Sequence, residues 1–201
     1  MTGAQAGLAR LSAAIAAGTP ADVAAQTRAA LEAGADPTAV YETVLQSYLF
    51  LGFPRAIEAL FAAVPVLEQA RSSGAAPAGA LPADPERWRR EGESLCRRVY
   101  GRNFDKLMEA MRRLSPELAD SMILEGYGKT LSRPGLGAIE REYAVVAILT
   151  ATRMWRQLRS HAIGAVNVGG TRADVKEAIA VSEPWVGRAT VDEALQVAGF
   201  A

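Results

Sequence analysis

The sequence predicts an all-helical protein. Apolar residues recur at three- and four-residue spacing along most of the chain, as they do on one face of a helix. Proline and glycine residues mark the places where such segments begin and end. No segment shows a convincing strand-like alternation of apolar and polar residues. Half of the 201 residues are apolar, so the chain can form one domain with a substantial core, or two small fused units.

Helix boundaries are clearest in the N-terminal third. The segment Thr19–Asp22 (TPAD) supplies an N-cap hydroxyl, a proline in the first turn and an acidic third residue, so a helix begins here. It is expected to reach Ala33 and to end at Gly34, because glycine readily adopts the left-handed conformation that closes a helix. The Asp-Pro pair at 36–37 begins the next helix, and the Gly-Phe-Pro segment at 52–54 breaks it. A third helix follows from that proline.

The segment 72–85 (SSGAAPAGALPADP) is rich in small residues and proline and has no periodicity, which predicts a flexible linker. The remaining apolar, periodic segments follow it. They predict helices over residues 85–99, 104–113, 118–127, 139–152, 155–168, 171–181 and 190–198.

An internal repeat relates the two ends of the chain at an offset of 135 residues. The aligned pairs include Gly34 with Gly169, Val40 with Val175, Glu42 with Glu177, Ser47 with Ser182, and Gly52 with Gly187. Ala-rich composition explains some of these matches, but not the aligned glycines that end helices. We therefore predict a helical repeat unit over 1–71, the linker over 72–85, and a second helical unit over 86–201. Neither copy is long enough to bury its own apolar face, so the two are expected to share one core.

Composition excludes several kinds of function. Basic and acidic residues both total 22, and this balance favours neither nucleic acid nor an anionic membrane as a partner. No apolar run is expected to reach the ~20 residues that span a bilayer, and no signal peptide is recognised. The single cysteine, Cys96, cannot form an internal disulfide or a redox pair. One histidine without a cysteine cluster predicts no metal site. A cytoplasmic protein is expected.

Several segments of the second half carry a resemblance to a known family. They are an Arg-Glu pair at 141–142, the segment 157–169 (QLRSHAIGAVNVG), and upstream pieces at 127–129 (YGK) and 133–136 (RPGL). Together they resemble the carboxymuconolactone decarboxylase family, which implies an alkylhydroperoxidase D-like helical fold. A further piece, 48–56 (YLFLGFPRA), is similar to the motif that normally closes that domain. Here it precedes the histidine, so the arrangement is duplicated or permuted.

The resemblance also separates two kinds of chemistry. Peroxidase members of the family carry a Glu, then a Cys-x-x-Cys pair, then a His. Counted from Glu142, the two cysteine positions are Met154 and Gln157, and the histidine position is His161. Without thiolates there is neither a nucleophile for peroxide nor a resolving partner. Thiol peroxidase activity is therefore not expected.

What the resemblance implies instead is a carboxy-lyase that uses acid–base chemistry and no cofactor on a small carboxylated lactone or related oxo acid. His161 would donate a proton or stabilise an enolate, Glu142 would orient it, and Gln157 would add a hydrogen bond. Nineteen residues of continuous helix would separate Glu142 from His161 by ~28 Å. They meet only if the chain turns near residues 153–154.

Four further residues are expected to bind the substrate. Guanidinium groups bind carboxylates in a bidentate manner, so arginines near the family-like segments are candidates to hold a small-molecule carboxylate. The candidates are Arg133, Arg141, Arg159 and, from the displaced Gly-Phe-Pro motif, Phe53. The resemblance and the aromatic residues of short helices, namely Phe50, Phe53, Trp155 and Trp185, also predict a homo-oligomer, a trimer or hexamer.

Two alternatives stay open from sequence alone. One is a non-catalytic member of the family that binds a ligand or a partner protein. The missing cysteines and the degraded second Gly-Phe-Pro element favour it, whereas the retained Glu142 and His161 oppose it. The other alternative keeps the acid–base chemistry and changes the substrate. Fold-level analogy does not separate these possibilities.

Overall fold

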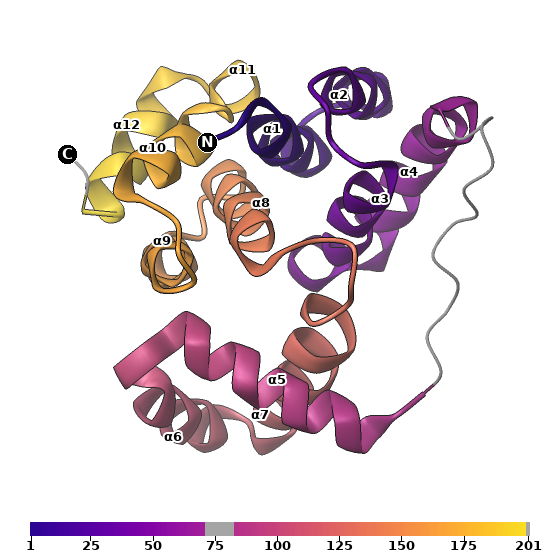
Figure 1. Ribbon diagram of the computed structural model, residues 1–201. Coiled ribbons are helices and arrows are strands. Elements are labelled where there is room, and N and C mark those ends of the chain that lie inside the picture. Colours follow the sequence, from indigo (N-terminus) through magenta and orange to yellow (C-terminus); the bar gives the residue numbers. More distant parts are fainter. Residues whose placement is uncertain (71–82, 200–201) are drawn as a thin grey trace.

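The computed structural model describes residues 1–70 and 83–199, and within these residues every regular element is helical (Figure 1). The all-α prediction is therefore confirmed. Residues 72–82 of the predicted linker lie outside the described residues. The N-terminal helices are α1 (Gly3–Ala17), α2 (Pro20–Glu32), α3 (Pro37–Gln46) and α4 (Tyr48–Ala70). The middle segment contains α5 (Pro85–Tyr100), the 3₁₀ turn η1 (Gly101–Asn103), α6 (Phe104–Leu114), α7 (Pro116–Ser121) and the π-helix η2 (Met122–Leu131). The C-terminal helices are α8 (Ala138–Ala151), α9 (Trp155–Asn167), α10 (Arg172–Ala180), α11 (Glu183–Val186) and α12 (Arg188–Val197).

Side-chain caps explain the predicted helix starts. The Thr19 hydroxyl accepts a hydrogen bond from the Asp22 amide (3.2 Å), and the Asp22 carboxylate accepts one from the Thr19 amide (2.8 Å). This reciprocal pair satisfies two amides that the first turn of a helix leaves free. Helix α10 begins with the same kind of cap, and so does α1, where a glutamine replaces the aspartate. Helix α1 is not among the predicted helices, because neither a proline nor an acidic residue marks its start.

The two repeated units are visible in the helix boundaries. Helices α1, α2 and α3 begin at residues 3, 20 and 37, and α8, α9 and α10 begin 135 residues later, at 138, 155 and 172. Gly52 and Gly187, which break the chain after α3 and α10, have similar left-handed conformations (φ 75° and 78°). Helices α1 and α8 pack together at the centre of the bundle (Figure 1). Ala9 and Ala13 of α1 belong to the same core cluster as residues of α8, α9 and α10, whereas Leu11 and Ile15 of α1 belong to a second cluster with residues of α2, α3 and α4.

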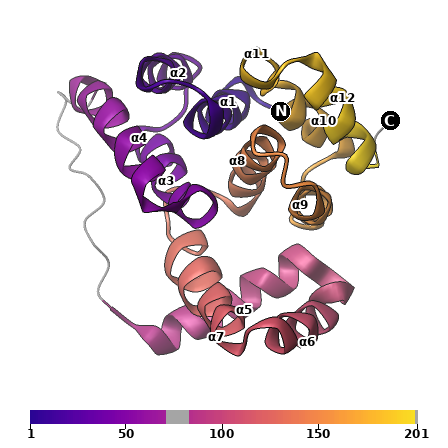
Figure 2. The same cartoon turned by 180° about the vertical axis from the view of Figure 1, so that it is seen from behind.

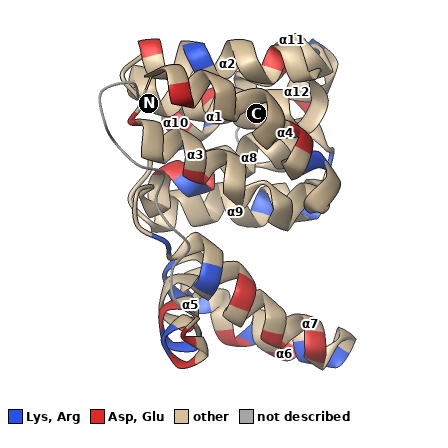
Figure 3. Ribbon diagram, turned by 90° about the vertical axis from the view of Figure 1, so that its right-hand side faces the viewer, with Lys and Arg blue, Asp and Glu red and all other residues tan. Residues whose placement is uncertain are grey.

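The middle segment forms a second layer. Figure 3 shows α5, α6 and α7 extending away from the bundle that the two units form. Helix α5 packs along η2 with the two backbones in contact: a Cβ on Gly92 would clash with the Ile123 carbonyl oxygen, and one on Gly128 would clash with the Trp88 carbonyl oxygen. Only glycine allows so close an approach. The π-helical form of η2 is not foreseen by the periodicity, which predicted an ordinary helix ending at residue 127.

Helix α4 is longer and more apolar than the sequence analysis expected of any segment. By length and composition it is the one helix of residues 1–70 and 83–199 that could cross a membrane, with a mean hydropathy of 1.6. The expectation that no apolar stretch reaches this length is therefore wrong here, because few charged residues interrupt α4. The helix also packs against α2 and α3, burying Ala56, Ala59 and Ala63. A cytoplasmic location stays a prediction.

The outer face of α4 carries an apolar stripe. Phe53, Ile57 and Phe61 follow one another at four-residue spacing and are 68%, 47% and 74% exposed. Of the aromatic residues that suggested self-association, Phe53 lies on this stripe, whereas Phe50, Trp155 and Trp185 pack against the core. We propose that copies of the chain associate through this stripe as a trimer or hexamer, because association removes it from water.

Light scattering after size exclusion tests the association. We expect a mass several times the 21.3 kDa of one chain, and a lower mass for Phe61→Glu, which places a charge in the stripe. Leu114→Glu is the matched control, since Leu114 is equally exposed (76%) but lies on α6. A wild-type mass near that of one chain at micromolar concentration would contradict the proposal.

Candidate functional site

The structure brings Glu142 and His161 into contact. The chain turns between α8 and α9, where Arg153 has a left-handed backbone (φ 55°), and the two helices pack side by side. The Nδ1 atom of His161 lies 2.9 Å from the Oε2 atom of Glu142. Both side chains are buried, at 4% and 3% exposed. The turn that the 19-residue separation requires is therefore present.

The geometry fixes which imidazole nitrogen is available. A carboxylate only accepts hydrogen bonds, so with Glu142 as a carboxylate the Nδ1–H group of His161 is the donor and Glu142 Oε2 the acceptor. Within residues 1–70 and 83–199 this is the imidazole's one hydrogen bond, which leaves Nε2 free to serve a ligand. A histidine oriented in this way, with a carboxylate behind it, is a common arrangement for proton transfer.

Gly164 makes the close packing around the pair possible. It lies one turn after His161 on α9, and a Cβ there would be 2.9 Å from Glu142 Oε2 and 2.7 Å from Val99 Cγ1 of α5. A larger residue would push α5 or the carboxylate away. Gly164 lies within the family-like segment 157–169, but the sequence gives no indication of this contact.

Two aromatic rings flank the imidazole, and sequence reasoning identified neither. Phe50 of α4 lies edge-on, with ring centroids 5.9 Å apart and an interplanar angle of 86°. Tyr100, the last residue of α5, lies at 6.2 Å and 67°. The displaced motif at 48–56 thus reaches His161, through Phe50. The predicted Phe53 instead stacks on Tyr48, at 5.2 Å.

A second tyrosine lies beside the first. Tyr127 of η2 packs edge-on against Tyr100, with ring centroids 6.2 Å apart and an interplanar angle of 71°. Burial raises the pKa of Tyr100 to about 12, an effect that the neighbouring Tyr127 partly offsets. Burial also holds the pKa of Tyr127 well above its usual value. Both phenols therefore stay protonated near neutral pH and act as hydrogen-bond donors.

Cys96 lies on α5 and is fully buried. Burial raises the pKa of its thiol to about 12, with a further contribution from the negative charge of Glu142. A raised thiol pKa favours the neutral form, so almost no thiolate is present at neutral pH.

We therefore expect no thiol-dependent peroxidase activity. Hydroperoxide reduction coupled to a dithiol donor should match the buffer blank, because the thiol is protonated, buried and without a second cysteine. The rate is measured by loss of the hydroperoxide. Turnover that disappears in Cys96→Ser would contradict this prediction.

Arg133 and Arg141 bind a carboxylate of the protein itself. Arg141 donates to Glu42 Oε2 (3.0 Å) and to Gln46 Oε1 (3.0 Å), and Arg133 donates to the Glu42 oxygens at 2.9 and 3.0 Å. Glu42 and Gln46 are fully buried on α3. This cluster joins the first repeat to the start of α8, the helix that carries Glu142. The structure thus gives these two arginines a structural partner.

The other predicted binding residues lie on the surface of α9. Gln157, one turn before His161, and Arg159 are both exposed. The structure does not place Arg159 or Phe53 against the imidazole, and their roles remain predictions. No group of three or more His, Cys, Asp or Glu side chains that could hold a metal occurs in the described parts of the chain.

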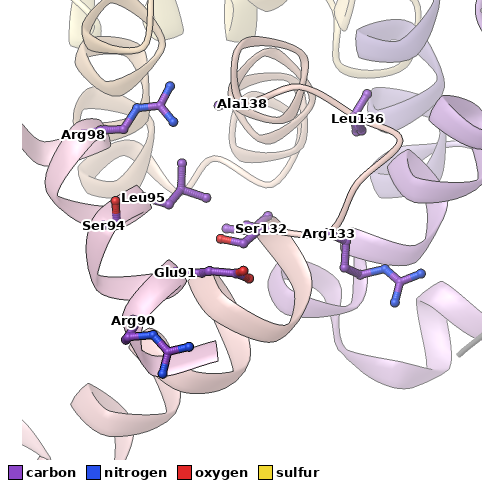
Figure 4. Close-up of a pocket in the computed structure, with 10 residues that line it drawn as sticks. Arg90, Glu91, Ser94, Leu95, Arg98, Ser132, Arg133, Leu136 and Ala138 are labelled. Atoms are coloured by element: carbon purple, nitrogen blue, oxygen red, sulfur yellow. The ribbon is translucent and has the colours of Figure 1, made fainter. Parts of the chain in front are cut away.

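A cavity of about 420 Å³ lies between α5, the end of η2 and the start of α8 (Figure 4). Its wall includes Ala138, one turn before Glu142, and Leu95, which is next to Cys96. Arg98 of α5 also lines it, whereas Figure 4 shows the Arg133 guanidinium turned away from the α5 residues. Neither Glu142 nor His161 is among the lining residues, so the cavity does not contain the pair.

Comparison with known proteins gives one family and two distant relatives. The sequence model of the carboxymuconolactone decarboxylase family matches residues 4–65 and 116–199. Peroxisomal protein 2 of Schizosaccharomyces pombe is 28% identical over 144 residues, 68% of this chain and 63% of that protein. Nitrosuccinic acid decarboxylase of Metarhizium robertsii is 26% identical over 110 residues, 53% of this chain and 76% of that enzyme. The chain therefore spans less than two thirds of the length of the first relative.

The matched segments do not include the whole site. Glu142, His161, Phe50 and Tyr127 fall within them, but α5 and α6 fall outside. Tyr100 and the rest of α5 are therefore contributed by a part of the chain that the family model does not describe.

Proposed function

The chain belongs to the carboxymuconolactone decarboxylase family, and on that premise we propose that it decarboxylates a small carboxylated lactone or related oxo acid by acid–base chemistry without a cofactor. The observation that carries the proposal is the buried Nδ1 hydrogen bond from His161 to Glu142, which leaves Nε2 free. A decarboxylase of this kind needs a positioned proton donor and a way to stabilise negative charge.

The proposed reaction has two steps. The bond between the substrate carbon and its carboxylate breaks, carbon dioxide leaves, and the electron pair moves through the conjugated system onto the lactone carbonyl oxygen. The Nε2–H of protonated His161 then delivers a proton to carbon, and the carbonyl re-forms. Glu142 keeps the proton on Nδ1 throughout and stabilises the imidazolium before transfer.

The decarboxylase relative supports a broader substrate class. Its name specifies nitrosuccinic acid, in which a nitro group can accept the electron pair as a carbonyl does. The shared feature is a carboxylate attached near an electron-accepting group. We propose that the substrate of this chain has that feature.

A substrate carboxylate also needs a cation. We propose Arg98 for this role ahead of Arg141, because Arg98 lines the cavity that Ala138, one turn before Glu142, also lines, whereas Arg141 is buried against Glu42. Guanidinium groups suit this contact through their paired donors. Arg159, exposed on α9, is a second candidate.

Decarboxylation of two probes tests the proposal. Carboxymuconolactone generated in situ is followed by ultraviolet absorbance, and nitrosuccinate by release of carbon dioxide. We expect wild-type protein to accelerate loss of at least one of them, and His161→Ala to lose that acceleration. Binding of both probes without carbon dioxide release would support the non-catalytic alternative. If the protein at micromolar concentration neither binds nor turns over either probe, the proposed substrate class is wrong.

A further inference from the structure

We infer that Tyr100 is a second substrate-contacting group of this site, whose hydroxyl donates a hydrogen bond to the oxygen that becomes negative as carbon dioxide leaves. The inference rests on the proposed function and adds to it a residue from α5, outside the segments that the family model matches. The fixed end of α5, the position of Tyr100 beside the imidazole and the chemistry of its hydroxyl carry it.

The end of α5 is fixed against α9. Gly101 ends the helix directly after Tyr100 with a left-handed backbone (φ 53°). The Asn167 side chain of α9 donates to the Val99 carbonyl at 2.8 Å, and Val99 also packs where Gly164 leaves room. Figures 1 and 2 show α5 crossing below α9 from either side. Tyr100 is therefore held at this position by its neighbours on both sides.

Tyr100 faces the imidazole and can still be reached by a ligand. Its ring centroid lies 6.2 Å from that of His161, at an angle of 67°. It is only partly buried, whereas His161 is 4% exposed. Phe50, the other ring beside the imidazole, offers no polar atom. Of the two rings, Tyr100 alone can donate a hydrogen bond to a ligand.

The Tyr100 hydroxyl has a proton to donate. Burial raises the pKa of this phenol to about 12, so it is protonated at neutral pH and can donate to an acceptor beside the imidazole. A positioned donor of this kind suits an oxygen that gains negative charge in the transition state. The hydroxyl gives up no proton in this role, since His161 supplies the proton to carbon.

Binding of a stable anion tests the inference without turnover. Loss of the carboxylate next to the nitro group of nitrosuccinate leaves 3-nitropropanoate, whose nitronate form carries its negative charge on the nitro oxygens. Its affinity is measured from the imidazole ¹⁵N signals of labelled protein, which are unambiguous because His161 is the only histidine. We expect Tyr100→Phe to weaken binding about 10- to 100-fold, the usual value of a hydrogen bond to a charged group.

Two controls accompany this measurement. Tyr41→Phe makes the same change on α3 and should bind as wild type does. Thermal unfolding should show that Tyr100→Phe is folded normally, since the ring and its packing remain. With an accepted substrate, Tyr100→Phe should lower kcat and leave KM nearly unchanged, because the hydrogen bond strengthens as charge develops.

The outcomes separate the two proposals. Tyr100-dependent binding of the nitronate without release of carbon dioxide from either probe would support the oxyanion contact and contradict the proposed function. Decarboxylation that is unaffected in Tyr100→Phe would support the proposed function and contradict the oxyanion contact. Equal nitronate affinity in wild type and Tyr100→Phe, or no wild-type binding at millimolar nitronate, would overturn the inference.

Discussion

Replacing His161 with alanine should lower turnover of an accepted substrate about 10²- to 10⁴-fold, the usual contribution of a positioned acid or base. The change removes the Nε2 proton donor and leaves the Glu142 carboxylate in place. Initial rates with carboxymuconolactone or nitrosuccinate measure the effect. Ser160→Ala is the matched control on the same helix, because its hydroxyl binds only the Arg156 carbonyl within the described residues and it should keep wild-type turnover.

A conservative variant distinguishes loss of the proton donor from loss of the fold. His161 is buried, so alanine leaves both a cavity and an unpaired carboxylate, which lowers stability. His161→Asn keeps an N–H near the position of Nδ1 and has no donor near Nε2. It should retain normal circular dichroism and lose turnover to the same extent as His161→Ala.

The pair should act as a unit. Glu142→Gln should slow the same step, because the imidazole is then less well oriented and its protonated form less stabilised. The double variant His161→Ala/Glu142→Gln should be little slower than the slower single one, since groups that act together are non-additive. Folded His161→Asn with wild-type turnover would remove the imidazole from the mechanism.

Local chemistry explains which parts of the fold could be predicted. The Thr19–Asp22 cap and the glycines at 34 and 169 act within a few residues, so sequence shows them directly. The 135-residue repeat followed from such signals, because both copies place their turns at equivalent positions. Helix α1 has no comparable marker. The close contact of Gly92 with Gly128 depends on how two helices meet, which no local pattern encodes.

The residues of the site also differ in how far the sequence predicts them. Glu142 and His161 could be paired from sequence because a short turn joins their helices and the family motif marks both. The contacts of Phe50 and Tyr100 could not, because they come from the other repeat and from a segment outside the family match. The positions 135 residues before Glu142 and His161 are Gly7 and Gln26. One repeat therefore carries the polar pair, while the other supplies Phe50.

The buried cluster around Glu42 should be the most sensitive point for stability. Glu42→Ala is expected to lower the free energy of unfolding by about 3–5 kcal/mol, the usual cost of removing one partner of a buried ion pair. Glu42 is fully buried and Arg141 is 2% exposed. Burial lowers the pKa of Arg141 and the Glu42 carboxylate counteracts that effect, so the variant leaves a cation with only neutral partners. Arg133, less buried, can turn toward water.

The repeat supplies a matched control for this measurement. Glu177 occupies the equivalent position on α10 but is 46% exposed and pairs with the chain's amino group, so Glu177→Ala should unfold at nearly the wild-type urea concentration. Replacing both Glu42 and Arg141 with methionine should recover much of the stability that Glu42→Ala loses, because no unpaired charge then remains in the core. Urea unfolding followed by circular dichroism compares the four proteins. A Glu42→Ala midpoint equal to that of Glu177→Ala would show that the ion pair does not hold the first repeat against α8, and the position of Glu142 would then depend on apolar packing alone.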